Sequence, residues 1–143
     1  MKIFLNRRRP IVLTALISIL VVLALQVLAT NAQAEDRKTR AITFLSSGLK
    51  TAATAQSTGF DVSAYNEGQV FVDVTAEGGA STLDITVQTS PDNITWYTHT
   101  TIAQITATGQ TRAAISNFGN YVRINYTVGG TSFTFSVVGV FKN

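Results

Sequence analysis

The sequence predicts an all-β fold, an antiparallel β-sandwich or jelly roll of about eight strands that follows an N-terminal hydrophobic signal helix. Three observations lead to this prediction. Apolar and polar residues alternate with a period of two in several stretches. Gly, Asn, Ser and Asp interrupt these stretches at intervals of about eight to twelve residues. The chain also holds 21 threonines, which suit the solvent face of a sheet, and no window after residue 40 sustains an apolar period of 3.6 residues.

Residues 1–34 have the layout of a secretory signal peptide. Residues 2–9 include four basic side chains, residues 11–28 form an uncharged and mostly apolar run, and Ala32 and Ala34 are the small residues that a signal peptidase recognises. The apolar run also has the minimum length for a membrane span, so an uncleaved anchor is the alternative. We therefore expect a protein that is secreted or held at the cell surface, outside the cytoplasm.

Removal of this leader changes the charge of the protein. The whole chain has a net charge of +3, whereas residues 35–143 carry seven basic and eight acidic side chains, a net charge of −1. This argues against nucleic acid as a partner, and against a membrane except through an uncleaved leader. Because the chain has no Cys, it has neither disulfides nor thiolate metal sites. The expected domain is residues 51–143, preceded by residues 35–50 as an extension or first strand.

Two pairs of alternating runs predict β-hairpins. Runs 70–75 and 83–88 flank a Gly78-Gly79 pair, and runs 121–128 and 131–141 flank Gly129-Gly130. Glycine reaches the positive φ values that tight hairpin turns require, and the second pair is the stronger signal. The residues expected to face the core are Val70, Val72, Val74, Leu83, Ile85, Val87, Val122, Ile124, Tyr126, Phe133, Phe135 and Val137. Weaker strands are expected at residues 51–56, 59–62, 94–98, 101–105 and 111–115.

The segment before these strands allows two interpretations. Within residues 35–49 a short apolar stretch contains Ala41, Ile42, Phe44 and Leu45. It is either the first strand of the same domain or an assembly strand that is donated to a second subunit by strand addition.

A turn with several hydrogen-bonding side chains lies at Ser90, Asp92, Asn93 and Trp96. Ser90 and Asp92 can accept backbone N–H bonds and close the turn, and Asn93 tolerates a left-handed conformation. Pro91 sets φ at an early turn position. We expect Trp96, the only tryptophan, to lie on the core.

Residues 87–96 resemble the strand, S-x-D-G-x-x-W turn and strand of discoidin (F5/8 type C) and related galactose-binding-like domains. Gly119-Asn120-Tyr121-Val122-Arg123-Ile124 resembles the "RYIRI" strand of the same families. The resemblance covers residues 61–141, without the terminal cysteines, amino-terminal strands and ligand-binding loops of a full discoidin domain. It is closer to compact versions of that domain in small phage or bacterial surface proteins, whose role is usually structural or adhesive. The resemblance implies a jelly roll. Because galactose-binding-like domains often carry a structural calcium ion, it also allows such an ion here.

Three function classes follow. The first is an exported, non-catalytic structural or adhesive protein of the cell surface that self-associates, for example as a filament subunit. The second is a carbohydrate-binding module of discoidin type that binds surface glycans, with Tyr65, Tyr97, Phe118 and Tyr121 as candidate ligand-binding residues. The third, a secreted hydrolase, has the weakest support.

The residues that could carry catalysis are few. His99 is the sole histidine and has no Asp or Glu within five residues, so neither a zinc site nor a local catalytic triad is indicated. Asp73 and Asp84 would be neighbours across the first hairpin, where solvated strand carboxylates are more common than a glycosidase pair. We therefore expect no enzyme activity, no catalytic residues, no metal ligands and no required cofactor. Sequons at Asn93 and Asn125 leave glycosylation open.

Overall fold

The computed structural model describes residues 38–143, all of whose regular elements are strands joined antiparallel. The expected leader and its signal helix lie outside these residues. Within residues 38–143 no helix is long and apolar enough to cross a membrane. The strands are β1 (Thr39–Gln56), β2 (Phe60–Asp61), β3 (Glu67–Glu77), β4 (Thr82–Ser90), β5 (Tyr97–Ile105), β6 (Gly109–Ser116) and β7 (Tyr121–Lys142).

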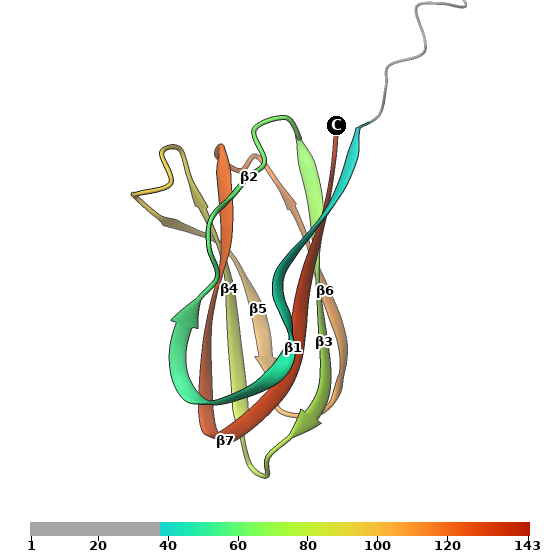
Figure 1. Cartoon of the computed structure of the whole chain (residues 1–143), viewed down its shortest axis with the longest axis vertical. Coiled ribbons are helices and arrows are strands. Elements are labelled where there is room, and N and C mark those ends of the chain that lie inside the picture. Colours follow the sequence, from blue (N-terminus) through green and yellow to red (C-terminus); the bar gives the residue numbers. More distant parts are fainter. Residues whose placement is uncertain (1–37) are drawn as a thin grey trace, which may run out of the picture. The chain divides into compact units, whose positions relative to one another are not determined.

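The predicted hairpin at Gly129-Gly130 is wrong, because β7 runs through both glycines as one strand. Its first half pairs with β4, from Tyr121 opposite Ser90 to Gly129 opposite Thr82. Its second half pairs with β3, and β1 follows the other side of β7 over nearly its full length. Because strand pairing continues on both sides of them, the glycines bend the strand instead of reversing it, with Gly130 at φ 82°. Figure 1 shows β7 and β1 curving together at the lower end of the molecule.

The hairpin predicted at Gly78-Gly79 is also wrong. β3 and β4 both run antiparallel to β7 along the same edge, so they follow each other around its bend and do not pair with each other. Ser81 ties the inside of this bend, because its buried hydroxyl oxygen accepts a hydrogen bond from the Thr131 amide at 2.9 Å. The Gly78 amide donates to the Ser132 carbonyl at 2.9 Å. The glycine-rich segment therefore carries the chain from one layer to the other.

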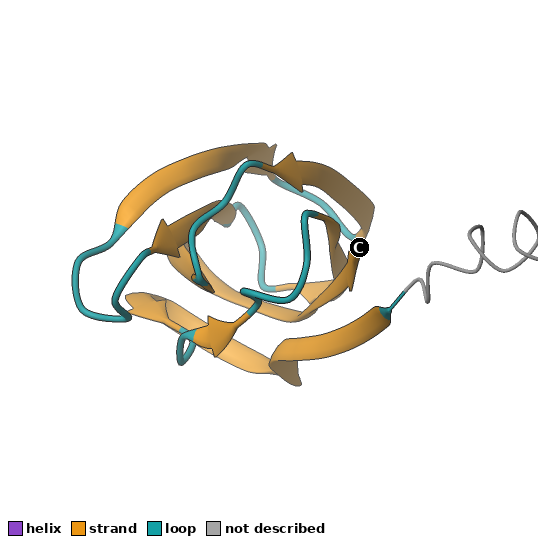
Figure 2. Ribbon diagram, turned by 90° about the horizontal axis from the view of Figure 1, so that it is seen from above, coloured by secondary structure: helices purple, strands orange, loops and turns teal. Residues whose placement is uncertain are grey.

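The bends divide the sheet into two layers. We call the first the β3 layer: β6, β3, residues 133–142 of β7 and residues 39–51 of β1. The second, the β4 layer, contains β5, β4, residues 121–129 of β7, residues 53–56 of β1 and β2. Viewed from above, the strands curl around a common interior (Figure 2). The all-β antiparallel prediction is confirmed, and the fold is jelly-roll-like with seven strands, because β1 and β7 each contribute to both layers.

The weaker strands differ from the sequence prediction in detail. Residues 51–56 are the second part of β1, so the boundary expected at residue 50/51 falls inside a strand. The strand expected at residues 59–62 contains only Phe60–Asp61, and residues 111–115 lie within β6. Of the strand expected at residues 94–98, residues 94–96 belong to the turn and only 97–98 are in a strand. These two continue into residues 101–105 as a single strand, β5, with a register shift opposite Val87/Gln88.

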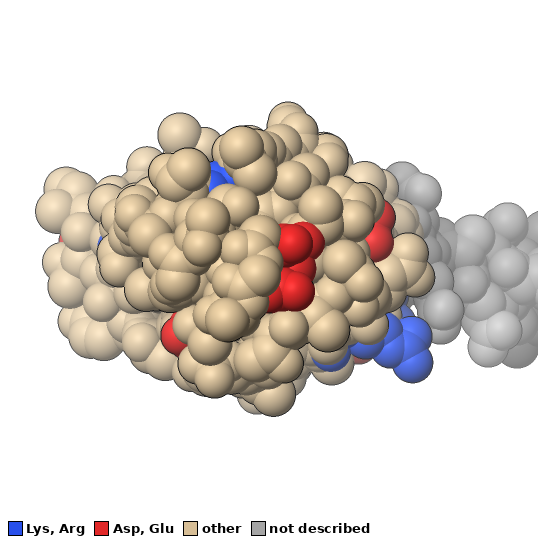
Figure 3. Space-filling view, turned by 90° about the horizontal axis from the view of Figure 1, so that it is seen from below, with Lys and Arg blue, Asp and Glu red and all other residues tan. Residues whose placement is uncertain are grey.

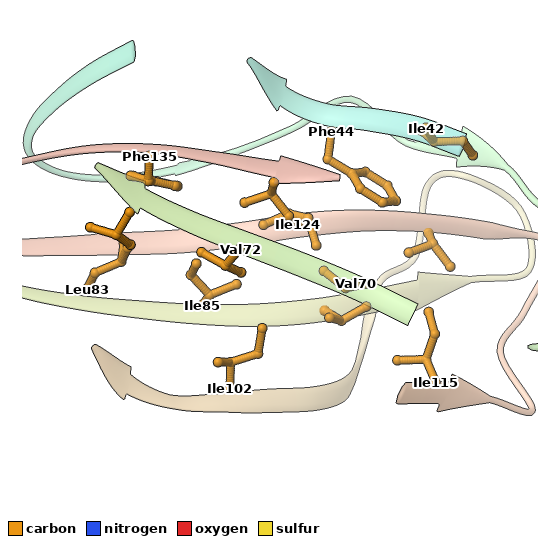
Figure 4. Close-up of a cluster of buried hydrophobic side chains, with 14 of the residues drawn as sticks. Ile42, Phe44, Val70, Val72, Leu83, Ile85, Ile102, Ile115, Ile124 and Phe135 are labelled. Carbon is orange, nitrogen blue, oxygen red and sulfur yellow. The ribbon is translucent and has the colours of Figure 1, made fainter. Parts of the chain in front are cut away.

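The core lies between the two layers. Side chains from β1, β3, β4, β5, β6 and β7 point into the same space (Figure 4). The predicted alternation is confirmed for the core positions except Tyr126, which is only partly buried and packs against Phe135 at 5.3 Å between ring centroids. Each buried Val, Ile, Leu or Phe stabilises the fold by about 1.5–3 kcal/mol relative to its exposed state.

Candidate functional site

The turn between β4 and β5 is held by the carboxylate of Asp92. Its Oδ1 accepts hydrogen bonds from the amides of Ile94 at 2.9 Å and Thr95 at 2.8 Å, and from the Ser90 hydroxyl at 2.9 Å. Its Oδ2 accepts from the Thr95 hydroxyl at 3.3 Å. These bonds, first those from the Thr95 and Ile94 amides, lower the pKa of Asp92 to about 2. Since both carboxylate oxygens are occupied, this side chain is suited to holding the turn.

Asn93 and Trp96 pack against the segment that precedes β2. Asn93 has φ 62°, a left-handed conformation. A Cβ placed on Gly59 would collide with the Asn93 side chain and would lie 2.7 Å from the Trp96 ring, so only glycine fits there. The turn and the segment before β2 therefore lie in close contact.

Trp96 does not lie in the core as the sequence suggested. It is half-buried on the outer face of the β4 layer, where the Arg123 guanidinium lies 4.2 Å from its ring centroid. The Nε atom of Arg123 donates to Gln88 Oε1 at 2.7 Å, and partial burial lowers the pKa of Arg123. Trp96 precedes the first residue of β5, so its position depends on the turn rather than on the alternation along the strand.

The same turn presents two exposed apolar side chains. Ile94 is 81% exposed and Tyr97 is 58% exposed. Tyr97 is one of the candidate ligand-binding residues, whereas Ile94 was not singled out from the sequence. The available signal was an apolar residue inside an otherwise polar turn, which is a weak one because single exposed apolar residues are common on protein surfaces.

The four candidate ligand-binding aromatics do not form one site. Tyr65 and Phe118 both pack on Phe141, with ring centroids 6.3 and 5.6 Å from it. Tyr121 is half-buried and pairs with Ser90, and Tyr97 pairs with Thr89 on the opposite side of β4. Two of the four therefore extend the core, and Tyr97 is the one that is strongly exposed.

The candidate assembly strand is paired within its own chain. Residues 39–43 of β1 lie opposite residues 138–142 of β7. Ile42 and Phe44 belong to the core, Leu45 is partly buried against it, and Ala41 is exposed on the outer face. In the described chain this stretch acts as the first strand of its own domain, and β1 has no strand on its outer edge among residues 38–143.

A lysine points inward at the irregular part of this edge. The ammonium group of Lys50 donates to the carbonyls of Ser46 at 3.4 Å and Gly48 at 3.3 Å, and it lies 4.8 Å from the centroid of the Phe135 ring. Partial burial lowers the pKa of Lys50. Bulges and inward-pointing lysines protect edge strands from unwanted pairing, so residues 46–50 interrupt the edge of β1.

His99 links the two layers. Its Nε2 lies 2.7 Å from the Ser116 carbonyl oxygen and its Nδ1 lies 2.7 Å from the Thr100 hydroxyl. Because a carbonyl only accepts, Nε2 carries the proton in this contact. The imidazole thus joins β5 to β6, with no carboxylate among its hydrogen-bond partners.

The two carboxylates expected to be neighbours are in different layers. Asp73 is on the outer face of β3, and Asp84 is on β4, where it accepts a hydrogen bond from Gln104 Nε2 at 3.0 Å. The prediction that they lie side by side is wrong because β3 and β4 do not pair. Among residues 38–143 no group of three or more His, Asp or Glu side chains is placed to hold a metal ion.

Charged groups are sparse on the described surface. Figure 3, a view from below, shows acidic and basic side chains as separate spots on a mostly uncharged face. The ion pair between Lys142 and Glu67, at 3.2 Å, is exposed and contributes little to stability.

Comparison with known proteins gives a family and a fold. A family model described as "Domain of unknown function (DUF6385)" matches residues 61–141. No curated protein matches the chain. The discoidin resemblance is not supported by this family or by the structures that follow.

Several solved structures share the fold. The PBSX exported protein XepA is 15% identical with a TM-score of 0.58, over 71% of this chain and 36% of its own. The SPBc2 prophage-derived protein YomS is 11% identical with a TM-score of 0.54, over 75% of this chain and 95% of its own. The VP2 subviral particle of infectious bursal disease virus is 11% identical with a TM-score of 0.50, over 76% of this chain and 33% of its own. The chain thus spans about a third of XepA and of VP2, and nearly all of YomS.

Proposed function

The chain belongs to the family described as "Domain of unknown function (DUF6385)", and from this premise we propose that it is an exported, non-catalytic structural or adhesive protein that assembles with copies of itself at the cell surface. The observation that carries the proposal is the fold, which is shared with a protein described as exported and with one that forms a subviral particle. The layout of residues 1–34 supports export.

The use of polar groups within the domain agrees with this function. Asp92 holds a turn, Ser81 holds a bend, and His99 joins two strands. Each is engaged with backbone groups of its own chain and not directed into a cleft. Such a domain is suited to presenting its faces and edges to other molecules.

Assembly is tested with the full chain, expressed with its leader and recovered after export. Sedimentation over a range of concentrations and electron microscopy should reveal oligomers, filaments or a lattice. A protein that stays monodisperse and monomeric at high concentration would overturn self-association.

Export is tested separately by the mass of the protein from its native cell, which should correspond to a chain beginning near Glu35. An intact leader on protein that remains in the cytoplasm would contradict it.

Glycan binding is the second candidate function. A protein that adheres to a surface by binding glycans can also assemble with copies of itself, so the two functions are compatible. The observation that favours it is Tyr97, which is exposed at the first residue of β5, directly after Trp96 and the β4–β5 turn. Aromatic rings at such positions bind sugars by stacking, with polar groups nearby for hydrogen bonds. A glycan array probed with the exported protein and with Tyr97→Ala tests it. Binding that disappears in the variant supports this function, and no binding to any glycan rejects it.

A further inference from the structure

The outer faces of the two layers differ in chemistry. On the β4 layer, polar side chains pair with one another: Gln88 with Arg123 at 2.7 Å, and Thr54 with Thr127 at 2.9 Å. The large apolar side chain on that face, Trp96, is half-buried and covered by the Arg123 guanidinium. The β3 layer instead carries Phe71, a large apolar residue that points outward from the middle of a strand and is 38% exposed. The β3 layer therefore has the more adhesive face.

Further apolar groups surround Phe71. Val138 lies opposite it on β7 and is half-buried, and Val140 follows two residues later on the same face. Ala114 on β6 and Ala41 on β1 are exposed in the row that contains Val140. Beside Phe71 a shallow hollow of about 240 Å³ is lined by Gly68, Gln69, Phe71, Val140 and Lys142.

Two opposite charges flank Phe71 without partners. Arg112 lies opposite Phe71 on β6, and Asp73 is two residues further along β3 on the same face. Within residues 38–143 neither side chain forms an ion pair or a hydrogen bond. The other acidic side chains of this region are all engaged, namely Asp61, Glu67, Glu77, Asp84 and Asp92. Lys38, just before β1, is also without an ion-pair or side-chain hydrogen-bond partner among the described residues, but Arg112 and Asp73 are the unpaired charges that lie beside the exposed phenylalanine.

The placement of these charges is self-complementary. From Phe71, Arg112 is one strand away, about 4.8 Å across the sheet, and Asp73 is two residues away, about 6.6 Å along the strand. The two directions are nearly perpendicular and of similar length. Consider a twofold axis that lies in the plane of the interface, passes through Phe71 and bisects the angle between these two directions. Rotation about this axis exchanges the direction toward Arg112 with the direction toward Asp73. It sets Arg112 over the partner's Asp73 and Asp73 over the partner's Arg112.

We propose that the outer face of the β3 layer binds the same face of a second copy of the chain, with Phe71 on the twofold axis and two Arg112–Asp73 pairs on either side. The strands of the two copies then cross at nearly a right angle, one of the two arrangements that stacked sheets adopt. Each copy uses the same patch, as in an isologous dimer. The inference names the interface for the self-association proposed above and rests on it.

The area of the face is smaller than that of a stable complex. Four strands about 4.8 Å apart and about eight residues of each give roughly 500 Å² of projected face. Stable complexes bury about 800 Å² per partner. We therefore expect a weak, concentration-dependent dimer that would be reinforced by further contacts in a larger assembly.

Charge exchange tests the geometry. Arg112→Asp and Asp73→Arg each place like charges together at both pairs, so each variant alone should dimerise at least about tenfold more weakly in sedimentation equilibrium at low salt. The mixture of the two single variants restores opposite charges at both pairs and should form a heterodimer. The double variant should also recover association. Asp84→Arg, an equal charge change on the outer face of the β4 layer, is the matched control and should dimerise as the unchanged chain does.

The outcomes separate this inference from the proposed function. Association that is insensitive to both single variants, or a mixture that stays monomeric, would overturn the Phe71 interface and leave self-assembly standing. An unchanged chain that is monomeric at every concentration would overturn both. A chain that stays monomeric but binds another surface protein, and loses that binding in Phe71→Gln, would show that this face binds a different partner. That outcome would also overturn the inference. Circular dichroism of each variant verifies that the fold is intact.

Discussion

Nε2 of His99 donates a hydrogen bond to the Ser116 carbonyl oxygen at 2.7 Å and so connects the two ends of the strand path, β5 and β6. These strands do not pair with each other, and this contact spans the side on which the layers are not joined by β7 or β1. A single imidazole thereby contributes to closing the curled sheet.

Replacing His99 should weaken the contact between β5 and β6. We expect His99→Leu to lower the free energy of unfolding by about 0.5–1.5 kcal/mol, the usual net value of one hydrogen bond. Urea unfolding measures the loss, and amide exchange should rise most in β6. The control is Thr98→Leu, an exposed β5 position whose side chain has no hydrogen-bond partner among the described residues. Equal stability of the two variants would mean that the His99 contact contributes nothing.

Asp92 should make stability depend on acid. Its folded pKa of about 2 is below the ordinary value of 3.8, so its carboxylate stabilises the fold above about pH 4. This contribution is lost as pH falls from about 4 toward 2, because the unfolded chain takes up the proton first. Asp92→Asn should therefore be less stable than the unchanged chain near neutral pH, and the difference should shrink through this window. Carbon-13 NMR titration checks the pKa directly, and an ordinary value near 3.8 would contradict the role assigned to the turn.

The first strand should be part of its own domain. Ile42→Ala should destabilise the protein by about 2–5 kcal/mol and Phe44→Ala by about 3–5 kcal/mol, because both side chains fill the core. Ala41→Ser, on the outer face, should change stability little. Thermal unfolding distinguishes this from strand donation. If these residues served only a second subunit, the monomer would keep its stability and assembly alone would fail.

The bend of β7 should depend on glycine. Gly130 has φ 82°, and a Cβ there would lie 3.0 Å from the Ala80 carbonyl oxygen and from the Ser81 Cα. Gly130→Ala should therefore cost about 1–3 kcal/mol from the strained backbone. Gly48→Ala is the control, since its added Cβ would have no atom closer than 3.8 Å. Chemical denaturation of both variants measures the difference. A neutral Gly130→Ala would show that the bend does not need a left-handed residue.

Local sequence and tertiary structure determined different properties of this protein. The period of two identified the core positions of β3, β4 and β7, because a strand places alternate side chains on opposite faces whatever it pairs with. Hydrogen bonds between near neighbours likewise made the Ser90 to Trp96 turn recognisable. Predictions of this kind needed only residues close together in the chain.

Only the tertiary structure decided what the glycine pairs do. A Gly-Gly between two alternating runs is compatible with a reversal or with a bend, and the choice depends on distant partners such as β1, which pairs with both halves of β7. The same choice separated Asp73 from Asp84 and left β6 to pair with β3, which placed Arg112 opposite Phe71. The position of Trp96 against Gly59 and Arg123 also depends on residues far along the chain. The sequence by itself therefore determined which side chains face inward, whereas long-range strand pairing determined the layers and the composition of the outer face.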